Sequence, residues 1–154
     1  MKMRLLSVGT KSPAWVRSGF EEYARRLPPE MPLQLTEITA PKHRGSADQF
    51  VHAEGEKMLA QITDNDWVVA MDERGRCVSS HQLAQRMEQW RMQRQNIVFM
   101  VGGSDGLAQA ATERANEQLS LSGLTLPHYM VRVILAEALY RAWTICSGHP
   151  YHRA

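Results

Sequence analysis

Two segments in the C-terminal third of the chain combine glycines, hydroxyl groups and turn-forming residues in a pattern that suits ligand binding. The first is the glycine-rich turn 102–106, which follows an apolar stretch. The second is the segment 121–128, Leu-Ser-Gly-Leu-Thr-Leu-Pro-His, which runs into a strongly helical stretch. Because glycine lets the main chain approach a ligand closely, we expect the function to concentrate here.

The turn 102–106 lies between a predicted strand and a predicted helix, a position that suits contact with an anion or a nucleotide. It lacks the G-x-G-x-x-G pattern and follows the fourth predicted strand, which argues against a Rossmann dinucleotide site. An ordinary strand-to-helix connection has the same spacing. Asp72 also follows an apolar strand and could bind a ligand there, but we interpret 71–75 as a turn that ends the strand.

The tail 148–154 is unusual because it holds two histidines, a tyrosine and an arginine. Tyrosine and histidine can stack on bases, and arginine can hold phosphate. A surface tail or a dimer contact would be the plainer reading. His128 could likewise cap or pack beside a helix start. The sequence shows neither a spacing typical of metal ligands nor a Ser/His/Asp arrangement.

Alternating apolar patterns predict the elements that position these residues. Strands are expected over 3–8, 33–38, 67–71, 97–101 and 119–121. Helices are expected through Val16, Phe20, Tyr23 and Leu27, over 48–61, from a cap at Ser80 through Leu83, Met87 and Trp90, over about 107–116, and from Val131 to Ile145. This alternation predicts a single α/β domain over 1–154, a mostly parallel sheet with helices on both faces.

Composition narrows the function classes. A chain of 154 residues is long enough for one domain with a real core. Its 18 basic and 16 acidic residues give a net charge of +2, too small to indicate nucleic-acid binding alone. We find no membrane span, no signal peptide and no C-x-x-C pairing of Cys77 with Cys146. We therefore expect a soluble cytoplasmic protein with reduced thiols.

The ordered set of motifs resembles the RlmH (YbeA-like) family of the SPOUT superfamily of methyltransferases. The resemblance covers nearly the whole chain. It is carried by Val8-Gly9-Thr10-Lys11, Phe20-Glu21-Glu22-Tyr23, the loop from Lys42 to Asp48, Glu54-Gly55-Glu56, Gly102-Gly103-x-x-Gly106, Leu121-Ser122-x-Leu124-Thr125-Leu126-Pro127-His128, Arg132, Glu137-x-Leu139-Tyr140-Arg141-Ala142 and Pro150-Tyr151-His152-Arg153.

The resemblance implies methyl transfer from S-adenosylmethionine to ring nitrogen N3 of a pseudouridine in bacterial large-subunit (23S) ribosomal RNA. The family acts as a homodimer on the assembled 70S ribosome. Its fold implies a C-terminal trefoil knot, an exception to the usual absence of knots, in about 70–154. The knot would hold the cofactor, and the chemistry needs no metal.

The resemblance also implies roles for individual residues. By position, the cofactor pocket would comprise Met71, Gly102, Leu121, Ser122, Gly123, Leu124, Thr125 and Leu126. The family often has Leu where this chain has Met71, a soft replacement of similar size, and Ala is common at Gly123. The acceptor would be held by His128, Arg132, Tyr151, His152 and Arg153. Of these, His152 is expected to accept the proton, with a purely positioning role as the alternative.

Local basic patches would compensate for the small net charge in docking on a ribosome. Candidates in the N-terminal half are Lys11, Arg17, Arg25, Arg26, Lys42, His43 and Arg44, although some could be solvated helix faces. A non-catalytic ribosome- or RNA-binding module could use the same basic loop and tail without a cofactor. A nucleotide-dependent oxidoreductase would need a glycine fingerprint that residues 8–12 do not supply.

Overall fold

The computed structural model describes residues 1–41 and 45–153. Within them, five strands form one sheet in the order β2-β1-β4-β3-β5, and every neighbouring pair is parallel. The strands are β1 (Met3–Val8), β2 (Leu33–Ile38), β3 (Asp66–Cys77), β4 (Asn96–Val101) and β5 (Glu117–Ser120). The predicted single α/β domain with a parallel sheet is confirmed.

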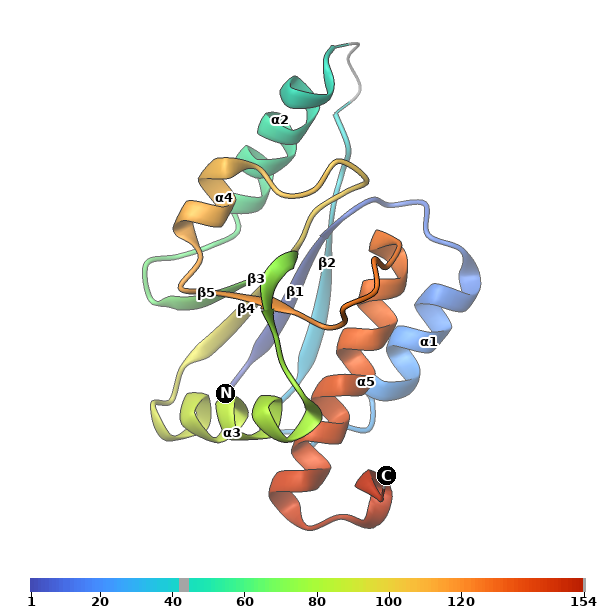
Figure 1. Ribbon diagram of the computed structural model, residues 1–154, viewed down its shortest axis with the longest axis vertical. Helices are drawn as coiled ribbons and strands as arrows, with labels where there is room; N and C mark the ends of the chain where they lie inside the picture. Colours follow the sequence, from blue (N-terminus) through green and yellow to red (C-terminus); the bar gives the residue numbers. More distant parts are fainter. Residues whose placement is uncertain (42–44, 154) are drawn as a thin grey trace.

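Helices cover both faces of the sheet, as predicted (Figure 1). One layer holds α1 (Ala14–Ala24), α3 (Ser80–Met92) and α5 (His128–Ser147), and the other holds α2 (Ala47–Leu59) and α4 (Gln109–Arg114). Helix α5 packs against both α1 and α3, while α2 packs against α4. A short 3-10 helix, η1 (Pro150–His152), follows α5 and packs back on it. Among the described helices, none is both long and apolar enough to cross a bilayer.

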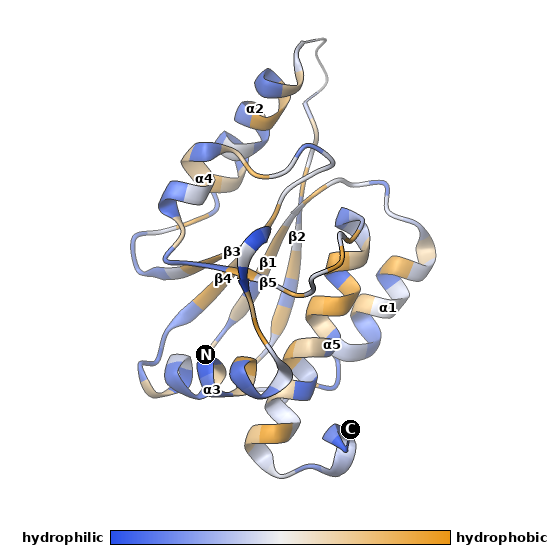
Figure 2. Cartoon of the chain, in the orientation of Figure 1, coloured by the Kyte–Doolittle hydropathy of each residue, from blue (hydrophilic) through white to orange (hydrophobic). Residues whose placement is uncertain are grey.

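The continuous apolar runs of the central strands are explained by burial on both faces. Side chains of a strand alternate between faces, so Leu5 and Phe99 point into the α1/α3/α5 layer. Their neighbours Leu6 and Val98 point into the α2/α4 layer, and all four are fully buried. Figure 2 shows the apolar strands enclosed between helices whose outer surfaces are polar.

Several predicted helix boundaries were wrong by a few residues. Helix α1 ends at Ala24, and Leu27 reaches the core from the following turn. Helix α3 is capped by Ser79 rather than Ser80, because the Ser79 hydroxyl accepts from the N–H of Gln82 while the Gln82 side chain accepts from the N–H of Ser79. Helix α4 stops at Arg114, since the backbone beyond it turns to pair with β3.

The largest difference concerns β3, which was predicted to end in a turn at 71–75. The strand instead runs to Cys77, and both Met71 and Arg76 are in register with Leu119 of β5. The residues between them form a bulge, a device that commonly redirects side chains beside functional sites. Gly75 permits this path, because a Cβ there would lie 2.9 Å from the β5 backbone.

The last strand and the last helix frame the edge of the sheet where ligands usually bind. β5 covers 117–120, two residues earlier at its start than predicted, so Leu121 begins the loop to α5. Helix α5 ends at Gly148, whose φ of +72° is left-handed. The carboxyl ends of β3, β4 and β5 are adjacent, which is the position expected for a ligand pocket in a parallel sheet.

Candidate functional site

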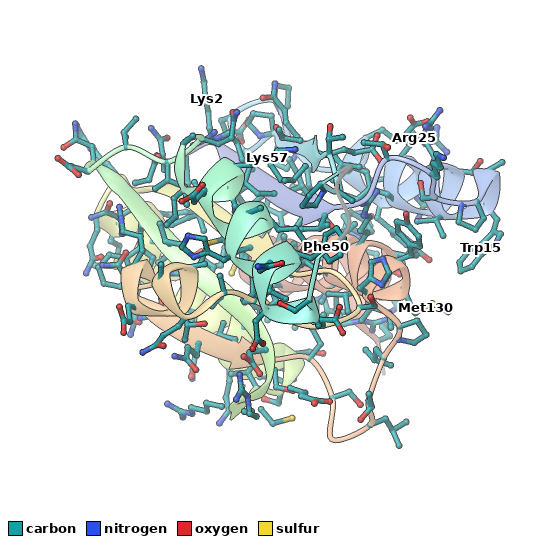
Figure 3. The ribbon with its side chains drawn as sticks, turned by 90° about the horizontal axis from the view of Figure 1, so that it is seen from above. Lys2, Trp15, Arg25, Phe50, Lys57 and Met130 are labelled. Atoms are coloured by element: carbon teal, nitrogen blue, oxygen red, sulfur yellow. The ribbon has the colours of Figure 1, made fainter. Side chains whose placement is uncertain are left out.

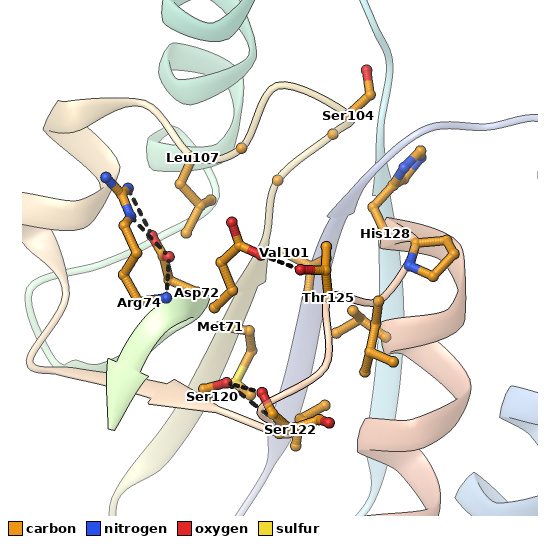
Figure 4. A pocket seen from close by; sticks show the side chains of 18 of the residues that line it. Met71, Asp72, Arg74, Val101, Ser104, Leu107, Ser120, Ser122, Thr125 and His128 are labelled. Atoms are coloured by element: carbon orange, nitrogen blue, oxygen red, sulfur yellow. Dashed lines mark hydrogen bonds and ion pairs between the residues drawn. The ribbon is translucent and has the colours of Figure 1, made fainter. Parts of the chain in front are cut away.

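A cavity of about 810 Å³ opens at the carboxyl ends of β3, β4 and β5 (Figure 4). Its walls come from three places: the bulge of β3, the glycine-rich turn after β4, and the loop between β5 and α5. The described lining residues are Met71, Asp72, Glu73, Arg74, Val101, Gly102, Gly103, Ser104, Asp105, Gly106, Leu107, Leu119, Ser120, Leu121, Ser122, Leu124, Thr125, Leu126, Pro127, His128 and Val131. This volume is in the range of small-molecule and cofactor sites.

Seven of the eight residues predicted to hold a cofactor line this cavity, and Gly123 is the exception. The seven are Met71, Gly102, Leu121, Ser122, Leu124, Thr125 and Leu126. A Cβ on Gly123 would meet nothing within 4 Å, so this position faces open space. The two segments singled out in the sequence therefore form two walls of one pocket, although their contact with a ligand stays a prediction.

The turn after β4 is tight enough that Gly102 has no room for a side chain. A Cβ there would lie 2.4 Å from the carbonyl carbon and oxygen of Gly106. The N–H of Gly106 donates to the carbonyl of Gly103, and Gly106 itself has a φ of +84°. The pocket wall here is bare main chain, which lets a bound molecule approach peptide groups directly.

The loop 121–127 is held by its own hydroxyl groups. The Ser120 hydroxyl donates to the carbonyl of Ser122 at 2.8 Å, and the Ser122 hydroxyl accepts from the N–H of Leu124 at 2.9 Å. Thr125 donates across the pocket to Oε2 of Glu73 at 3.1 Å. Leu124 is 75% exposed at the rim. The loop therefore presents hydroxyl groups and apolar side chains without a regular element.

The acidic residues of the β3 bulge were not predicted to belong to the site. The side chain of Asp72 accepts from the N–H of Arg74 at 2.9 Å and from its guanidinium at 3.2 and 3.1 Å. The hydrogen-bonded guanidinium lowers the pKa of Asp72. Glu73 and Asp105 also line the pocket. Their position after two apolar strands was the available indication, since parallel strands end at one edge.

Of the five residues predicted to bind the acceptor, only His128 lines the described pocket. It is the first residue of α5, and its ring lies 4.3 Å from that of Tyr129. Burial lowers the pKa of His128, and the positive charge of Arg132 lowers it further. The ring is therefore neutral at pH 7 and can accept a hydrogen bond from a ligand.

Arg132 is completely buried and does not line the pocket, and its contact with the acceptor stays a prediction. Its guanidinium donates to the hydroxyl of Ser7 at 2.9 Å and to Oε2 of Glu37 at 3.0 Å. It also donates to the carbonyls of Val8 and Gly9 at 3.2 and 2.7 Å. These bonds fasten the first turns of α5 to the ends of β1 and β2.

The tail residues Tyr151, His152 and Arg153 do not line the pocket either. The Tyr151 hydroxyl donates to Glu137 at 2.9 Å, and its ring lies 4.6 Å from that of Tyr140. Burial and the bond to Glu137 raise the pKa of Tyr151 to about 12. Helix α5 has 20 residues, so its two ends lie roughly 30 Å apart. Figure 1 shows the tail at the end of α5 far from the loop 121–127.

His152 contains a polar atom without a partner. Its Nδ1 is buried and makes no hydrogen bond with the described residues. A buried polar atom without a partner is uncommon and costs free energy. In this chain it belongs to a residue that the sequence singled out for chemistry.

Only some of the predicted basic residues have a positive charge that is not paired with a nearby acid. Arg25 and Arg26 both pair with Glu22, which reduces their net field. Figure 3 shows Trp15 on α1 and Arg25 just after it projecting outward, and Trp15 is 55% exposed. The predicted basic loop Lys42-His43-Arg44 lies outside the described residues. In the two described ranges, no cluster of three His, Cys, Asp or Glu residues could hold a metal ion.

Comparison with known proteins identifies the family. A family profile described as a predicted SPOUT methyltransferase matches residues 1–152. The chain belongs to the SPOUT methyltransferase family. Within this family, ribosomal RNA large subunit methyltransferase H of Hahella chejuensis is 52% identical over 155 residues, covering 99% of both chains. The protein of the same name from Burkholderia mallei is 49% identical over the full length of both.

A solved structure supports the fold of this SPOUT methyltransferase. A probable methylase family protein from Haemophilus influenzae matches 99% of this chain and 70% of its own, with a TM-score of 0.57 and 13% sequence identity. At that identity the likeness concerns the fold alone. Membership of the SPOUT family implies the C-terminal trefoil knot that the sequence resemblance led us to expect.

Proposed function

We propose that this SPOUT methyltransferase transfers a methyl group from S-adenosylmethionine to N3 of a pseudouridine in bacterial large-subunit (23S) ribosomal RNA. It would act in the cytoplasm, as a homodimer, on the assembled 70S ribosome. The main structural support for this proposal is the cavity between the glycine-rich turn 102–106 and the loop 121–127. The chain's 52% identity to a ribosomal RNA large subunit methyltransferase supports the substrate class.

The pocket fits a nucleoside-sized methyl donor. Its volume of about 810 Å³ lies within the usual range for small-molecule and cofactor sites. We propose that Met71, Leu121, Leu124 and Leu126 supply apolar walls. Main-chain groups at Gly102, Ser122 and Thr125 would supply polar contacts. The cofactor-binding part of the domain would then span about 70–154.

Methyl transfer requires few chemical groups from the protein. S-adenosylmethionine supplies an electrophilic methyl group when it is bound. The residues of the chain must hold the acceptor nitrogen in line, exclude water and take up one proton. The neutral ring of His128, which lines the cavity, can accept a hydrogen bond from the acceptor base. Arg132 would act as a positioning residue, because it fixes the helix that carries His128.

The tail would complete the site from the second protomer. Tyr151 is bonded to the far part of its own α5, so the tail does not approach the pocket of its own chain. In a two-fold dimer, a surface of one subunit can lie beside the site of the other. We propose that Tyr151, His152 and Arg153 of the partner subunit meet the pocket in this way, with His152 taking the proton and Arg153 holding a phosphate.

The decisive experiment measures transfer of labelled methyl groups from S-adenosylmethionine to whole ribosomes, separated subunits and free ribosomal RNA. The particles should come from cells that lack this enzyme. We expect label in the large-subunit RNA of whole ribosomes, at a pseudouridine. A folded, dimeric protein that labels none of these substrates would overturn the proposal and favour a binding module without catalysis.

The role of His152 can be tested separately with His152→Ala. A proton-accepting role predicts a large fall in single-turnover rate with nearly normal affinity for the ribosome. Unchanged chemistry with weakened ribosome binding would leave His152 a positioning role only. His52→Ala is the matched control, because His52 is exposed on α2, in the other helix layer.

A further inference from the structure

The charges that line the pocket do not cancel. At pH 7 its described lining residues include three carboxylates, those of Asp72, Glu73 and Asp105, and one guanidinium, that of Arg74. Arg74 binds Asp72 through two side-chain hydrogen bonds, and its positive charge also interacts with the neighbouring Glu73. His128 adds no charge because burial lowers its pKa. With three carboxylates against one guanidinium, the described lining of the pocket carries an excess of two negative charges.

Glu73 is the better placed of these two acids. Its Oε2 accepts a hydrogen bond of 3.1 Å from Thr125, so the carboxylate on the β3 bulge is joined to the loop on the opposite wall (Figure 4). Glu73 is exposed to solvent, so this bond joins the two walls at the open side of the pocket. Asp105 lies in the turn 102–106, near Glu54 on α2, whose carboxyl pKa is raised by burial and by the charge of Asp105.

The proposed methyl donor changes its charge when it reacts. S-adenosylmethionine carries a sulfonium cation at the centre of the molecule, between the nucleoside and the amino acid. When the methyl group moves to the acceptor nitrogen, the electron pair of the broken C–S bond stays on sulfur. The product is a neutral thioether, and the proton of the acceptor leaves with a base. The ammonium and carboxylate of the amino-acid part are the same before and after.

We propose that Glu73 is a specificity-determining residue of this pocket: its carboxylate favours the cationic sulfonium donor over the neutral thioether product. This inference rests on the proposed function. A negative charge between the walls attracts a positive charge at the centre of a ligand that bridges them. After transfer the attraction is lost, which weakens the hold on the product and speeds its exchange for a new donor molecule.

The bond to Thr125 suggests how Glu73 is placed without being neutralised. A threonine hydroxyl orients the carboxylate without adding a charge that would cancel it. Glu73→Gln keeps an acceptor oxygen for Thr125 and removes only the charge. Thr125→Val removes the bond and leaves the charge. The two variants thus separate electrostatic selection from simple positioning of the loop.

Calorimetric titration with S-adenosylmethionine and S-adenosylhomocysteine tests the inference without any assay of activity. We expect Glu73→Gln to reduce the preference for the sulfonium, measured as the ratio of the two dissociation constants, by about three- to tenfold. Thr125→Val should shift both constants together and keep the ratio. Glu113→Gln is the matched control, since Glu113 is an exposed acid on α4 outside the pocket.

Salt dependence gives a second readout. The ratio in the wild type should fall as KCl rises from about 0.05 M to about 0.5 M, and Glu73→Gln should flatten that fall. An unchanged ratio in Glu73→Gln would overturn the inference, as would an equal loss of affinity for both ligands, which would place Glu73 on a group that they share. Failure of the wild type to bind either ligand would instead remove the proposed function itself.

Discussion

The hydroxyl of Tyr151 donates a hydrogen bond of 2.9 Å to Oε1 of Glu137, an atom that also pairs with Arg141 at 2.7 Å. The guanidinium of Arg141 lies 5.0 Å from the centre of the Tyr151 ring. These contacts hold the C-terminal tail against its own helix α5. His128 begins that helix at the pocket, roughly 30 Å from its other end. One protomer therefore separates the two sets of residues that the proposed reaction brings together.

Mixed dimers should recover activity that neither parent has. Gly102→Ala damages the pocket and His152→Ala damages the tail. If each site joins the pocket of one protomer to the tail of its partner, a heterodimer of the two variants contains one intact site. We expect about half of the wild-type transfer rate per heterodimer. Tagged heterodimers purified away from both homodimers provide the measurement, and a heterodimer as inactive as its parents would show that each site is built within one chain.

Two glycines of the predicted cofactor site should respond differently to the same substitution. Gly102→Ala would place a Cβ 2.4 Å from the carbonyl of Gly106, so the turn must move. We expect donor affinity to fall at least about tenfold, with a loss of about 1–3 kcal/mol in stability. Gly123→Ala meets nothing within 4 Å and should behave like the wild type. Titration calorimetry and thermal unfolding of both variants give the comparison, and equal affinities would remove Gly102 from the site.

Arg132 should matter first for stability. Arg132→Met removes the charged partner of the Glu37 carboxylate. It also leaves the Ser7 hydroxyl and two carbonyls without their hydrogen-bond donor. We expect the free energy of unfolding in urea to fall by about 3 kcal/mol. Arg91→Met is the matched control, because Arg91 pairs with Glu88 on the exposed surface of α3 and should cost less than about 1 kcal/mol. A variant as stable as the wild type would contradict this role of Arg132.

The lowered pKa of His128 predicts a specific pH dependence of the folding stability. Its pKa in the folded state is lowered, so below the unfolded value of about 6.5 the unfolded chain binds more protons. Folding stability is complete above that value and is lost as the pH falls through the lower folded pKa. His128→Gln cannot titrate, so its unfolding free energy should decline less than that of the wild type below about pH 6.5. Parallel pH series, with NMR titration of the ring, would expose a normal pKa if the prediction is wrong.

Local sequence was enough to predict most of the fold. The continuous apolar runs 67–71 and 97–101 indicated buried parallel strands, and β3 and β4 contain them. The periodicity from Val131 to Ile145 indicated the last helix, which extends only a little further in each direction. These predictions succeeded because burial on a strand or a helix face leaves a regular repeat along the chain. The bulge of β3 left no such repeat, since only pairing with β5 keeps those residues in the strand.

The candidate site also combines features that the local sequence predicts with contacts that only the tertiary structure shows. The sequence by itself determined that the turn 102–106 and the segment 121–127 are bare or hydroxyl-rich loops after strands. Glycine allows backbone conformations that other residues avoid, and proline fixes φ, so both favour turns locally. Only the tertiary structure decided that Glu73 meets Thr125 across 52 positions and that Arg132 meets Glu37 across 95. It also placed the tail at the far end of α5. Strand order and helix packing set such contacts, and local periodicity carries no record of them.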